Sequence, residues 1–593
     1  MTEPKRLFDC LEFQIQNGGK PDMLAAKENG QWIKYSTADV IAIVEQLVAG
    51  LLEAGVSYND GTTEGRDKIA ILSKNQPQWL MLDLAVQKAG AVLTPFYPTL
   101  HINELEYVLN DAQVKFIFVN DENEYEKVSS IKARIPSLLE IFTFEKVEGA
   151  RHWKELFRPV SETVKNKIQE LSETIKSADL ATIIYTSGTT GKPKGVMLSH
   201  NNILSNVLAC VPCLPVSDLR VLSFLPLNHI FERLISYFYM YKGASIYYAE
   251  SMEAIGDNLK EVSPNMFTTV PRLLEKVYDK IMKKGSDLTG IKKRMFFWAH
   301  DLASKFEINQ NQGMWYNMQL AIANKLIFSK WREALGNNII CIVSGGAACQ
   351  VRLIRIFTAA KIPIMEGYGL TETSPVISVN RFQETGRKFG TVGPVLDNVE
   401  VKIAEDGEIL CKGPNIMMGY YRQPELTQEV ITDNWFHTGD IGTIVDNRFL
   451  KITDRKKEMF KTSGGKYVAP LPIENKLKES MYIEQVMVLG ADKKYVGALI
   501  VPSFPNLKDW AKQNGIEDRT NEGLIKNPKV KELFKDLLEG FNKYFNHVEQ
   551  VKRFELVAAE WSIESGEMTP KLSLKRKIVM EKNAAAIDRI YPG

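Results

Sequence analysis

The chain of 593 residues is too long for one ordinary hydrophobic core, so we expect at least two domains. Its formal net charge of +2, with 45% hydrophobic and 25% charged residues, is that of an ordinary globular protein and provides no basic surface for nucleic acid. The N-terminal segment has no apolar run of signal-peptide length, and charged residues interrupt the most apolar long segment, 221–248. We therefore expect no nucleic-acid partner, no secretion signal and no transmembrane helix.

Cysteine usage predicts a reducing compartment. Of the six cysteines, only Cys210 and Cys213 have the spacing of redox or metal sites, and neither a second cysteine pair nor a set of histidine ligands accompanies them. We expect two reduced, packed thiols. A cytoplasmic location fits this expectation.

Strands and helices alternate in the first part of the chain. Between residues 68 and 119, three apolar strand patterns are separated by two helical patterns. This order predicts an α/β fold with a doubly wound parallel sheet. Residues 121–178 are charged and irregular, and we expect surface helices and loops there.

A loop rich in glycine and hydroxyl residues follows at 185–195, with the sequence YTSGTTGKPKG. Its glycines let the backbone turn tightly around an anion, its hydroxyls can bond phosphate oxygens, and Lys192 and Lys194 supply positive charge. The spacing differs from that of a Walker A loop. Apolar runs on both sides predict a turn between two short strands, with a helix starting at Asn201 or Asn202. We interpret the loop as a phosphate cradle, and a solvated turn is the alternative.

This loop resembles the phosphate loop of the adenylate-forming enzymes, a superfamily that includes acyl-CoA synthetases, firefly luciferase and the adenylation domains of peptide synthetases. The resemblance implies that ATP is a substrate, that Lys192 is catalytic and that Thr186 contributes to a metal site. The nucleotide contacts that it implies in the loop are Thr186, Ser187, Gly188, Thr189, Thr190, Gly191 and Lys194.

The segment 224–233, FLPLNHIFER, opens an aromatic-rich helix that ends at Gly243. Aromatic stripes at helical spacing usually mark core packing, and a single histidine is often a buried residue with ordinary partners. The segment also resembles a block of the long-chain acyl-CoA synthetases that places a histidine near the reacting carboxylate and starts the acyl tunnel. The resemblance implies this catalytic role for His229.

Residues 283–335 have the pattern of a helical insertion. Basic residues stand beside aromatic residues there, as in KKRMFFW at 292–298. One interpretation is a segment that lies on a membrane surface. The other, which we favour slightly, is a helical hairpin packed on its own domain. An insertion of this kind also occurs in the long-chain family.

Two consecutive strands, each followed by a glycine turn, predict a ligand site. The buried strand 339–343 leads into SGGA at 344–347, and the strand 362–365 leads into EGYGLTET at 366–373. The carboxyl ends of adjacent parallel strands share one edge, where open α/β sheets bind nucleotides. We therefore expect both turns to face one ligand.

Three residues of the second turn have chemistry suited to a nucleotide. Tyr368 offers an aromatic face for adenine, Glu372 is a hard oxygen ligand suited to Mg²⁺ between phosphates, and Thr371 can bond a phosphate oxygen. The resemblance assigns catalysis and metal binding to Glu372. It assigns nucleotide binding to Gly345, Gly346, Ala347, Glu366, Gly367, Tyr368, Gly369 and Thr371.

Short alternating strands at 399–453 predict a small β-rich subdomain. Within it, WFHTGD at 435–440 ends in Asp440, and one carboxylate can accept hydrogen bonds from both ribose hydroxyls. A structural Gly-Asp turn is the alternative. In the resembling family the matching aspartate binds ribose.

The charged segment DRKKEM at 454–459 is, by its composition, a solvated linker. The resemblance makes it the hinge between a large N-terminal domain, 1–453, and a small mobile α+β domain, 460–593, of ordinary domain size. Residues implied to contact the nucleotide or to act when this domain rotates are Arg455, Lys461 and Lys466.

Near the C-terminus the sequence departs from the family. Adenylate-forming enzymes usually carry a lysine that reaches the carboxylate and the α-phosphate, and aligned from Thr569 and Pro570 this position is Ser573. A serine cannot offset the charge that builds up when a carboxylate attacks a phosphate. Lys571 and Lys575 flank it at two-residue spacing, which on an extended strand puts all three on one face. We expect one of these lysines to substitute, and the sequence does not choose between them.

The resemblance covers nearly the whole chain and favours a long-chain-fatty-acid–CoA ligase that uses Mg²⁺, ATP and coenzyme A and forms an acyl-adenylate. Two alternatives stay open. One is a ligase that loads a carrier protein. The other is a protein that binds fatty-acyl groups and nucleotides but is a poor catalyst because of Ser573. The sequence also leaves open the oligomeric state, including a homodimer, and peripheral contact with the inner face of a membrane.

Overall fold

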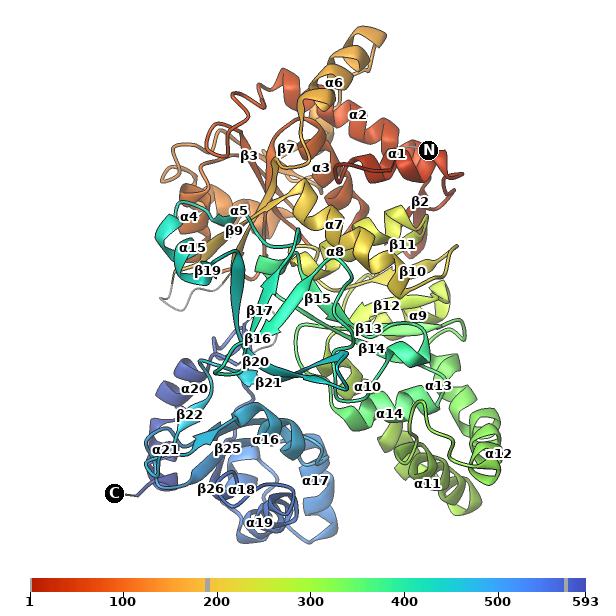
Figure 1. The fold of residues 1–593 in the computed structure, drawn as a ribbon, viewed down its shortest axis with the longest axis vertical. Coiled ribbons are helices and arrows are strands. Elements are labelled where there is room, and N and C mark those ends of the chain that lie inside the picture. Colours follow the sequence, from red (N-terminus) through yellow and green to blue (C-terminus); the bar gives the residue numbers. More distant parts are fainter. Residues whose placement is uncertain (1–2, 187–191, 570–573, 593) are drawn as a thin grey trace.

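The computed structural model describes residues 3–186, 192–569 and 574–592. A large N-terminal part contains two eight-stranded sheets and one five-stranded sheet, and a smaller domain follows at the C-terminal end of the chain (Figure 1). The mixed α/β fold expected from the sequence is confirmed.

The first sheet includes the two strands that flank the predicted phosphate loop. Its strands are β3 (Lys68–Leu72), β4 (Val92–Phe96), β5 (Val114–Val119), β6 (Glu140–Thr143), β7 (Arg151–His152), β8 (Leu180–Thr186), β9 (Lys194–Ser199) and β18 (Gly419–Tyr420). They lie in the order β18-β9-β8-β4-β3-β5-β6-β7. Pairing is parallel from β8 to β7, whereas β9 pairs antiparallel with both β8 and β18. The two strands on either side of the predicted turn, β8 and β9, therefore pair as a β-hairpin.

The second sheet carries the two predicted glycine turns. Its strands are β1 (Leu24–Glu28), β2 (Gln31–Tyr35), β10 (Arg220–Ser223), β11 (Ser245–Tyr248), β12 (Met266–Thr269), β13 (Cys341–Ser344), β14 (Ile364–Gly369) and β15 (Val376–Val379). Their order is β15-β14-β13-β12-β10-β11-β1-β2, with antiparallel strands only at the two edges. Because β13 and β14 are parallel neighbours, the turns that follow them share one edge, as the sequence predicted.

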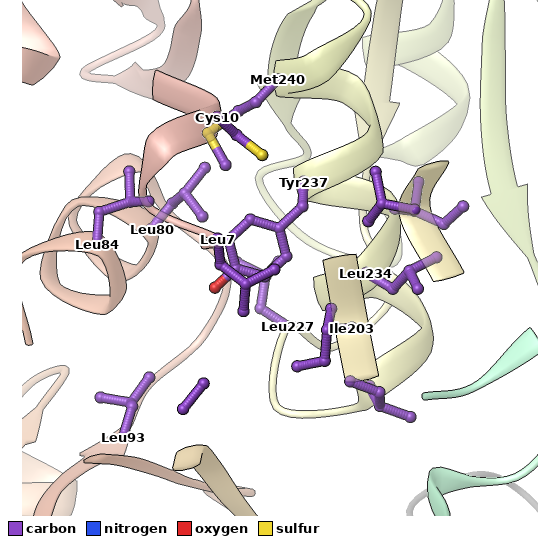
Figure 2. Packing of buried hydrophobic residues seen from close by; sticks show 14 of the residues in the cluster. Leu7, Cys10, Leu80, Leu84, Leu93, Ile203, Leu227, Leu234, Tyr237 and Met240 are labelled. Carbon is purple, nitrogen blue, oxygen red and sulfur yellow. The ribbon is translucent and has the colours of Figure 1, made fainter. Parts of the chain in front are cut away.

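Helices α3 (Pro77–Lys88) and α8 (Ile230–Tyr241) belong to a core that both large sheets share. Nearly every residue of each helix is buried, which is typical of a helix enclosed on all sides. Figure 2 shows Leu80 and Leu84 of α3 on one side and Tyr237 and Met240 of α8 on the other, with Cys10 of α1 (Asp9–Gln16) next to Met240. The aromatic stripe of α8 is therefore core packing.

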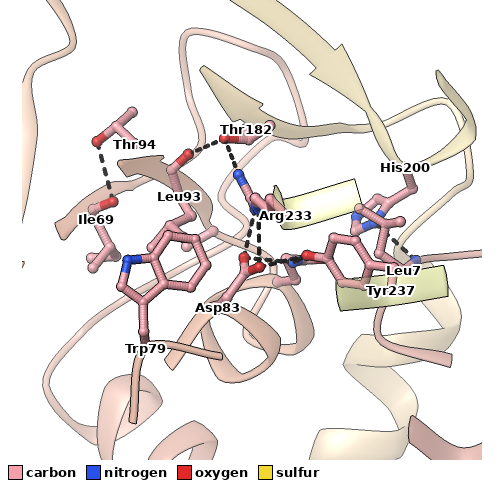
Figure 3. Close-up of polar contacts among 12 residues, drawn as sticks. Leu7, Ile69, Trp79, Asp83, Leu93, Thr94, Thr182, His200, Arg233 and Tyr237 are labelled. Atoms are coloured by element: carbon pink, nitrogen blue, oxygen red, sulfur yellow. Dashed lines mark hydrogen bonds and ion pairs between the residues drawn. The ribbon is translucent and has the colours of Figure 1, made fainter. Parts of the chain in front are cut away.

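A buried ion pair joins these two helices. Arg233 and Asp83 lie 2.6 Å apart, and both side chains have an exposed fraction of 0%. The hydroxyl of Tyr237 donates to the same carboxylate, and Arg233 donates to Thr182 of β8 at 2.6 Å (Figure 3). Because every member of this network has a partner, it fixes α8 against the strand that leads into the predicted phosphate loop.

The N-terminal part contains further helices besides α1, α3, α8 and those between residues 271 and 334. They are α2 (Thr37–Glu53), α4 (Ile102–Asp111), α5 (Glu122–Lys132), α6 (Glu162–Thr174), α7 (His200–Cys210), α9 (Ile255–Val262), α14 (Val351–Ala359) and α15 (Pro424–Val430). None of the helices in the described part of the chain has the length and apolar character needed to span a bilayer.

Two local predictions were wrong. Residues 121–178 contain β6 and β7 in addition to helices, and β6 is almost fully buried at four residues, too short for an apolar pattern to stand out. The helix after the phosphate loop begins at His200, because the hydroxyl of Ser199 accepts from the amide of Asn202 while the Asn202 side chain accepts from Ser199.

The segment 283–335 is helical, as predicted. It contains the end of α10 (Pro271–Asp287), then α11 (Gly290–Ser304), α12 (Met314–Ala323), a π-helix (Asn324–Phe328) and α13 (Ser329–Ala334). Its buried side chains, including Phe296, Phe328 and Trp331, pack in one core with α14. The hairpin that we favoured thus packs on its own domain, and α11 and α12 lie at the lower right edge of Figure 1.

The β-rich subdomain is a sheet of β16 (Glu400–Ile403), β17 (Glu408–Lys412), β19 (Ile431–Thr432), β20 (Trp435–Val445) and β21 (Phe449–Arg455), with antiparallel pairing throughout. Strand β21 reaches Arg455, so the first two residues of the predicted hinge still belong to this sheet.

The C-terminal domain has a separate hydrophobic core. Its strands are β22 (Phe460–Lys461), β23 (Tyr467–Val468), β24 (Ile483–Leu489), β25 (Val496–Pro502) and β26 (Val551–Leu556). Its helices are α16 (Pro470–Leu477), α17 (Phe504–Gln513), α18 (Asn521–Lys526), α19 (Pro528–Asn542), α20 (Arg576–Lys582) and α21 (Ala584–Ile590). This is the α+β layer that the sequence predicted.

Candidate active site

A lysine, a tyrosine and a glutamate from separate elements converge where the phosphate loop ends. Lys194 starts β9, and the antiparallel pairing of β18 with β9 places Tyr420 beside it, so that the lysine Nζ lies 4.3 Å from the tyrosine ring centroid. The hydroxyl of Tyr420 donates to Glu372 Oε1 at 2.9 Å. Burial lowers the pKa of Lys194, and the nearby carboxylate of Glu372 acts in the opposite direction. A cation and a carboxylate thus lie on either side of Tyr420.

The ends of the predicted phosphate cradle lie next to this cluster. Thr186 is the last residue of β8 and pairs with Lys194 across the hairpin. The side chain of Lys192 is exposed, with Nζ 5.6 Å from the ring centroid of Tyr107. The other predicted contacts in the loop, which lie outside the described residues, are Ser187, Gly188, Thr189, Thr190 and Gly191.

The donor set around Glu372 suits a magnesium ion that is shared with phosphates. Glu372 is half-buried in a short 3-10 turn (Thr371–Thr373) that follows β14, and Thr371 is buried. The described residues contain no group of three or more His, Cys, Asp or Glu side chains close enough to enclose a metal. Mg²⁺ commonly takes one or two protein oxygens and completes its shell with water and phosphate. Glu372 and the Thr186 hydroxyl fit that pattern.

Asp440 forms a hydrogen-bonded chain with two other predicted site residues. Its carboxylate accepts from the Tyr368 hydroxyl at 2.7 Å and from Arg455 Nε at 3.0 Å. Burial raises the pKa of Asp440, against the opposing effects of the Arg455 guanidinium and the Tyr368 hydroxyl. A carboxylate offers about four acceptor positions, so two partners leave capacity for a ribose. Asp440 lies within β20, directly after Gly439, which has a φ of +71°, and ribose binding by Asp440 stays a prediction.

The buried side chain of Glu366, at the start of the second predicted turn, bonds to the backbone just after the first turn. The sequence placed 366–369 in a turn, but these residues still belong to β14. The Glu366 carboxyl is buried and accepts from the amide of Cys349 at 3.0 Å, and burial raises its pKa to about 7. Of the three residues predicted in the first turn, Gly345 is buried, whereas Gly346 and Ala347 are exposed beside it.

Two of the glycines are explained by the chain itself, one by a close backbone contact and one by its backbone conformation. A Cβ on Gly369 would lie 1.7 Å from the carbonyl oxygen of Pro375, so the chain itself requires a glycine there. Gly346 has a φ of +81°, which favours glycine. Gly367 differs, since its Cβ would meet no heavy atom closer than 3.5 Å. There is therefore room for a ligand beside Gly367, as there is beside Gly346, where the nearest heavy atom lies 3.9 Å from the Cβ position.

His229 lies at the start of α8, beside the first glycine turn. Its Nδ1 accepts from the amide of Phe231 at 3.1 Å, so in the neutral ring Nε2 carries the hydrogen. A Cβ on Gly345 would lie 3.2 Å from the ring of Phe231, which shows how closely this end of α8 approaches the turn. The side chain of His229 is half-buried. The structure thus brings His229 to the same edge as the glycine turns.

The predicted lysines of the C-terminal domain are not gathered at this cluster. Lys461 and Lys466 are exposed on the β22–β23 hairpin, and Lys575 is half-buried, with its amide donating to the carbonyl of Glu567 at 2.7 Å. In the ranges that the structure describes, none of the three side chains bonds to Glu372 or Asp440. Lys571 lies outside those ranges.

The comparison with known proteins agrees with this arrangement. A family model described as AMP-binding enzyme matches residues 13–421, and a model of the AMP-binding enzyme C-terminal domain matches residues 458–593. The chain belongs to the AMP-binding enzyme family. The second match begins within the predicted hinge segment, and together the two matches include every predicted site residue except Asp440 and Arg455.

Individual relatives cover nearly the full chain. The long-chain-fatty-acid–CoA ligase FadD15 of Mycobacterium bovis is 31% identical over 570 residues, which is 95% of this chain and 93% of that protein. Long chain acyl-CoA synthetase 3 of Arabidopsis thaliana is 30% identical over 631 residues, 98% of this chain and 91% of that protein. Among solved structures, the adenylation domain of a carboxylate reductase from Mycobacterium chelonae superimposes with a TM-score of 0.74 at 19% identity, covering 99% and 91% of the two chains. The first two are relatives in sequence, and the third shows the fold.

The structure also identifies residues that the sequence analysis missed. Tyr420 was not predicted, although it lies between Lys194 and Glu372. Its signal in the sequence was the apolar and aromatic segment 416–421, IMMGYY, just after the β-rich strands. The six cysteines are free and buried, as expected for packed thiols.

Proposed function

We propose that this protein activates long-chain fatty acids to acyl-CoA in two steps. The carboxylate of the fatty acid attacks the α-phosphorus of ATP to give an acyl-adenylate and pyrophosphate, and the thiol of coenzyme A then displaces AMP. The observation that carries the proposal is the convergence of Lys194, Tyr420 and Glu372, in a chain about 30% identical over nearly its full length to long-chain-fatty-acid–CoA ligases. No nucleophilic side chain is needed.

The residues at the phosphate loop act by position and charge. Lys194 and Lys192 bind the phosphates that leave as pyrophosphate, and the Thr186 hydroxyl and Glu372 would hold Mg²⁺. When bound, Mg²⁺ neutralises phosphate charge. Burial of Lys194 strengthens its attraction for a phosphate, because the charges are less screened by water.

The residues around Asp440 hold the nucleoside. Asp440 accepts hydrogen bonds from the ribose hydroxyls, and Arg455 lies beside the same sugar. The Tyr368 ring packs against adenine, and its bond to Asp440 fixes the ring orientation. Glu366, two residues before Tyr368 on the same strand, stabilises this part of β14 through its bond to the Cys349 amide. Adenine passes beside Gly367, where a Cβ would meet no heavy atom closer than 3.5 Å.

The fatty-acid carboxylate binds between His229 and the phosphate loop. The Nε2–H of His229 donates to it, and the N-terminus of α8 adds a favourable partial positive charge. Phe231, the half-buried aromatic residue at the start of the same helix, lines the beginning of the acyl tunnel.

We further propose that the chain divides into an N-terminal domain at 1–453, a hinge at 454–459 and a C-terminal domain at 460–593. In one orientation of the C-terminal domain, either Lys571 or Lys575 reaches the α-phosphate for the first step. Rotation about the hinge then brings the face with Lys461 and Lys466 to the active site for the second step. The hinge lies near the site, since the positive charge of Lys457 contributes to the lowered pKa of Lys194.

Mass spectrometry tests the whole reaction. Purified protein is incubated with Mg²⁺, ATP, coenzyme A and an equimolar mixture of saturated and unsaturated fatty acids, and AMP and each acyl-CoA are followed. Joint formation of AMP and long-chain acyl-CoA is expected. AMP without thioester would point to a carrier-protein acceptor, and bound ATP without either product would leave a binding protein that lacks a lysine at Ser573.

A lysine exchange tests the departure at position 573. The double variant Lys571→Met and Lys575→Met should lower pyrophosphate release by about a hundredfold, the usual effect of losing a group that stabilises developing charge. Adding Ser573→Lys to this variant should restore most of the rate. An unchanged rate in the double variant would show that neither lysine takes part.

We place the enzyme in the cytoplasm, in peripheral contact with the inner face of a membrane. The free state of all six cysteines supports the reducing compartment. A long-chain fatty acid partitions into bilayers, so a membrane is the natural source of this substrate.

A further inference from the structure

The outer side of α12 and of the π-helix that continues it exposes a continuous row of large apolar side chains. Met314, Met318, Ile322 and Leu326 follow one another at four-residue spacing, and Trp315 lies next to the first of them. Their exposed fractions are 87%, 46%, 43%, 49% and, for Trp315, 69%. Successive steps of four residues in a helix turn by about 40°, so all five side chains share one side. We call these five residues the α12 face.

The opposite side of the same helices is well packed. Ala323 and Phe328 are buried, and Asn324 donates to the carbonyl of Ala359 on α14 at 2.9 Å. The Tyr316 hydroxyl donates to the carbonyl of Leu302 on α11 at 2.9 Å. Since these contacts fix the orientation of α12, its apolar face points outward by construction. An exposed apolar row of this length marks an interaction surface.

Exposed basic residues lie in the π-helix that continues α12 and on the neighbouring helix α11. Lys325 lies within the same row of α12 and the π-helix, and Lys292 and Arg294 are exposed at the start of α11, next to Ile291, whose exposed fraction is 75%. In the described ranges none of these three cations forms an ion pair, whereas the exposed Lys305 and Lys330 nearby are paired with acidic neighbours. The charge available for a partner is therefore positive.

A single helix connects this surface to the candidate active site. Helix α10 starts at Pro271, immediately after Val270, which lies 3.9 Å from the position of a Cβ on Gly346. Its 17 residues span about 25 Å before α11 begins. In Figure 1, α11 and α12 form the outer end of this arm, on the side of the molecule away from α6.

We propose that the α12 face docks on a bilayer that contains anionic lipid. Trp315 and the aliphatic side chains enter the interface between headgroups and acyl chains, and Lys292, Arg294 and Lys325 contact the anionic headgroups. The inference rests on the proposed function, because it assigns the membrane contact of the fatty-acid ligase to these residues. A protein partner would bury the same apolar row but has no general need for unpaired cations around it.

Vesicle binding tests the docking surface. The purified full chain is sedimented with extruded vesicles of phosphatidylcholine alone, or of phosphatidylcholine with about 30% phosphatidylglycerol to give an anionic surface. The variant Met314→Ser, Trp315→Ser, Met318→Ser should bind the anionic vesicles at least about tenfold more weakly than the natural chain. A matched control, Leu139→Ser, Met252→Ser, Met580→Ser, removes apolar groups that are 58%, 56% and 44% exposed elsewhere and should bind unchanged.

A charge variant tests the second half of the inference. Lys292→Glu, Arg294→Glu, Lys325→Glu should abolish the preference for anionic vesicles while keeping the thermal unfolding temperature, since all three side chains are exposed. Equal vesicle binding by the apolar variant and the matched control would overturn the proposal. So would a natural chain that elutes as a dimer while the apolar variant elutes as a monomer, because the face would then join two copies.

The two proposals fail in different measurements. Acyl-CoA formation from a fatty acid delivered on albumin should be the same in the natural chain and the apolar variant, because no residue of the α12 face belongs to the candidate active site. Absence of acyl-CoA from both would overturn the proposed function without bearing on vesicle binding. Loss of acyl-CoA formation only with vesicle-borne fatty acid is the expected result for the apolar variant.

Discussion

Replacing Tyr420 by phenylalanine isolates one hydrogen bond of the candidate site. The substitution keeps the ring that lies 4.3 Å from Lys194 Nζ and removes only the hydroxyl that donates to Glu372 at 2.9 Å. The proposed function gives this hydroxyl a positioning role, since it holds the carboxylate that would bind Mg²⁺. Loss of the bond should therefore weaken the metal site and leave the phosphate contact of Lys194 in place.

The size of the effect follows from the charge of the acceptor. A hydrogen bond to an ionised group contributes about 1.5–3 kcal/mol. Because about 1.4 kcal/mol corresponds to a factor of ten, the Mg²⁺ concentration for half-maximal activity should rise by about 10- to 100-fold, as is usual when a partner of a metal ligand is removed. Saturating Mg²⁺ should restore most of the maximal rate.

The assay is pyrophosphate release, measured as a function of free Mg²⁺ at constant ATP. Tyr421→Phe is a matched control: the neighbouring residue of the same chain segment also donates to a carboxylate at 2.9 Å, but its partner Glu64 lies outside the candidate site. The control should keep the Mg²⁺ dependence of the natural chain. If Tyr420→Phe shifts the Mg²⁺ dependence no more than Tyr421→Phe does, the positioning role of Tyr420 is wrong.

Three further predictions concern stability. Burial raises the pKa of Glu232 from 4.5 to about 7, so the folded state keeps this proton to higher pH than the unfolded state does. The protonated carboxyl therefore contributes its whole stabilisation below pH 4.5, and this contribution is lost as the pH rises through 7. Glu232→Gln should remove the loss and raise the free energy of unfolding in urea by about 3 kcal/mol at pH 8, and equal pH profiles of the two chains would contradict the argument. Asp83→Asn leaves the charge of Arg233 buried without its partner and should lower the free energy of unfolding by about 3–5 kcal/mol. A smaller loss would show that the Arg233–Asp83 pair is not buried. Gly369→Ala should lower the free energy of unfolding by about 1–3 kcal/mol. Gly367→Ala should leave this free energy unchanged and instead weaken ATP binding. A larger loss of stability in Gly367→Ala than in Gly369→Ala, measured by calorimetry, would disprove the packing argument.

Much of the fold could be predicted from local patterns. The alternation of strands and helices at 68–119 and the two strands before the glycine turns identified parallel sheets, because apolar periodicity reports which side of an element is buried. The pattern failed for β6, since a buried strand of four residues is too short to show a period. It also misplaced the start of α7, because Ser199 and Asn202 cap each other by a reciprocal bond.

Part of the candidate site was also readable from the sequence. The loop at 185–195 and the EGYGLTET turn join rare residue types at fixed local spacing, and such chemistry is visible without a fold. Glu366 shows the limit of that method, because nothing local indicates that its carboxyl turns away from the edge to accept from Cys349. The need for glycine at position 369 likewise arises from the carbonyl of Pro375.

The sequence by itself determined the fold class and led to the proposal of the phosphate loop and of most candidate residues, since these depend on composition and on short spacings. The tertiary structure decided what lies beside what. Tyr420 meets Lys194 and Glu372 only because β18 pairs with β9 across more than 200 residues of chain, and Tyr368 meets Asp440 at a separation of 72 residues. The outward direction of the α12 face is likewise set by packing of its opposite side. Long-range pairing depends on the packing of the whole chain, so no local pattern specifies it.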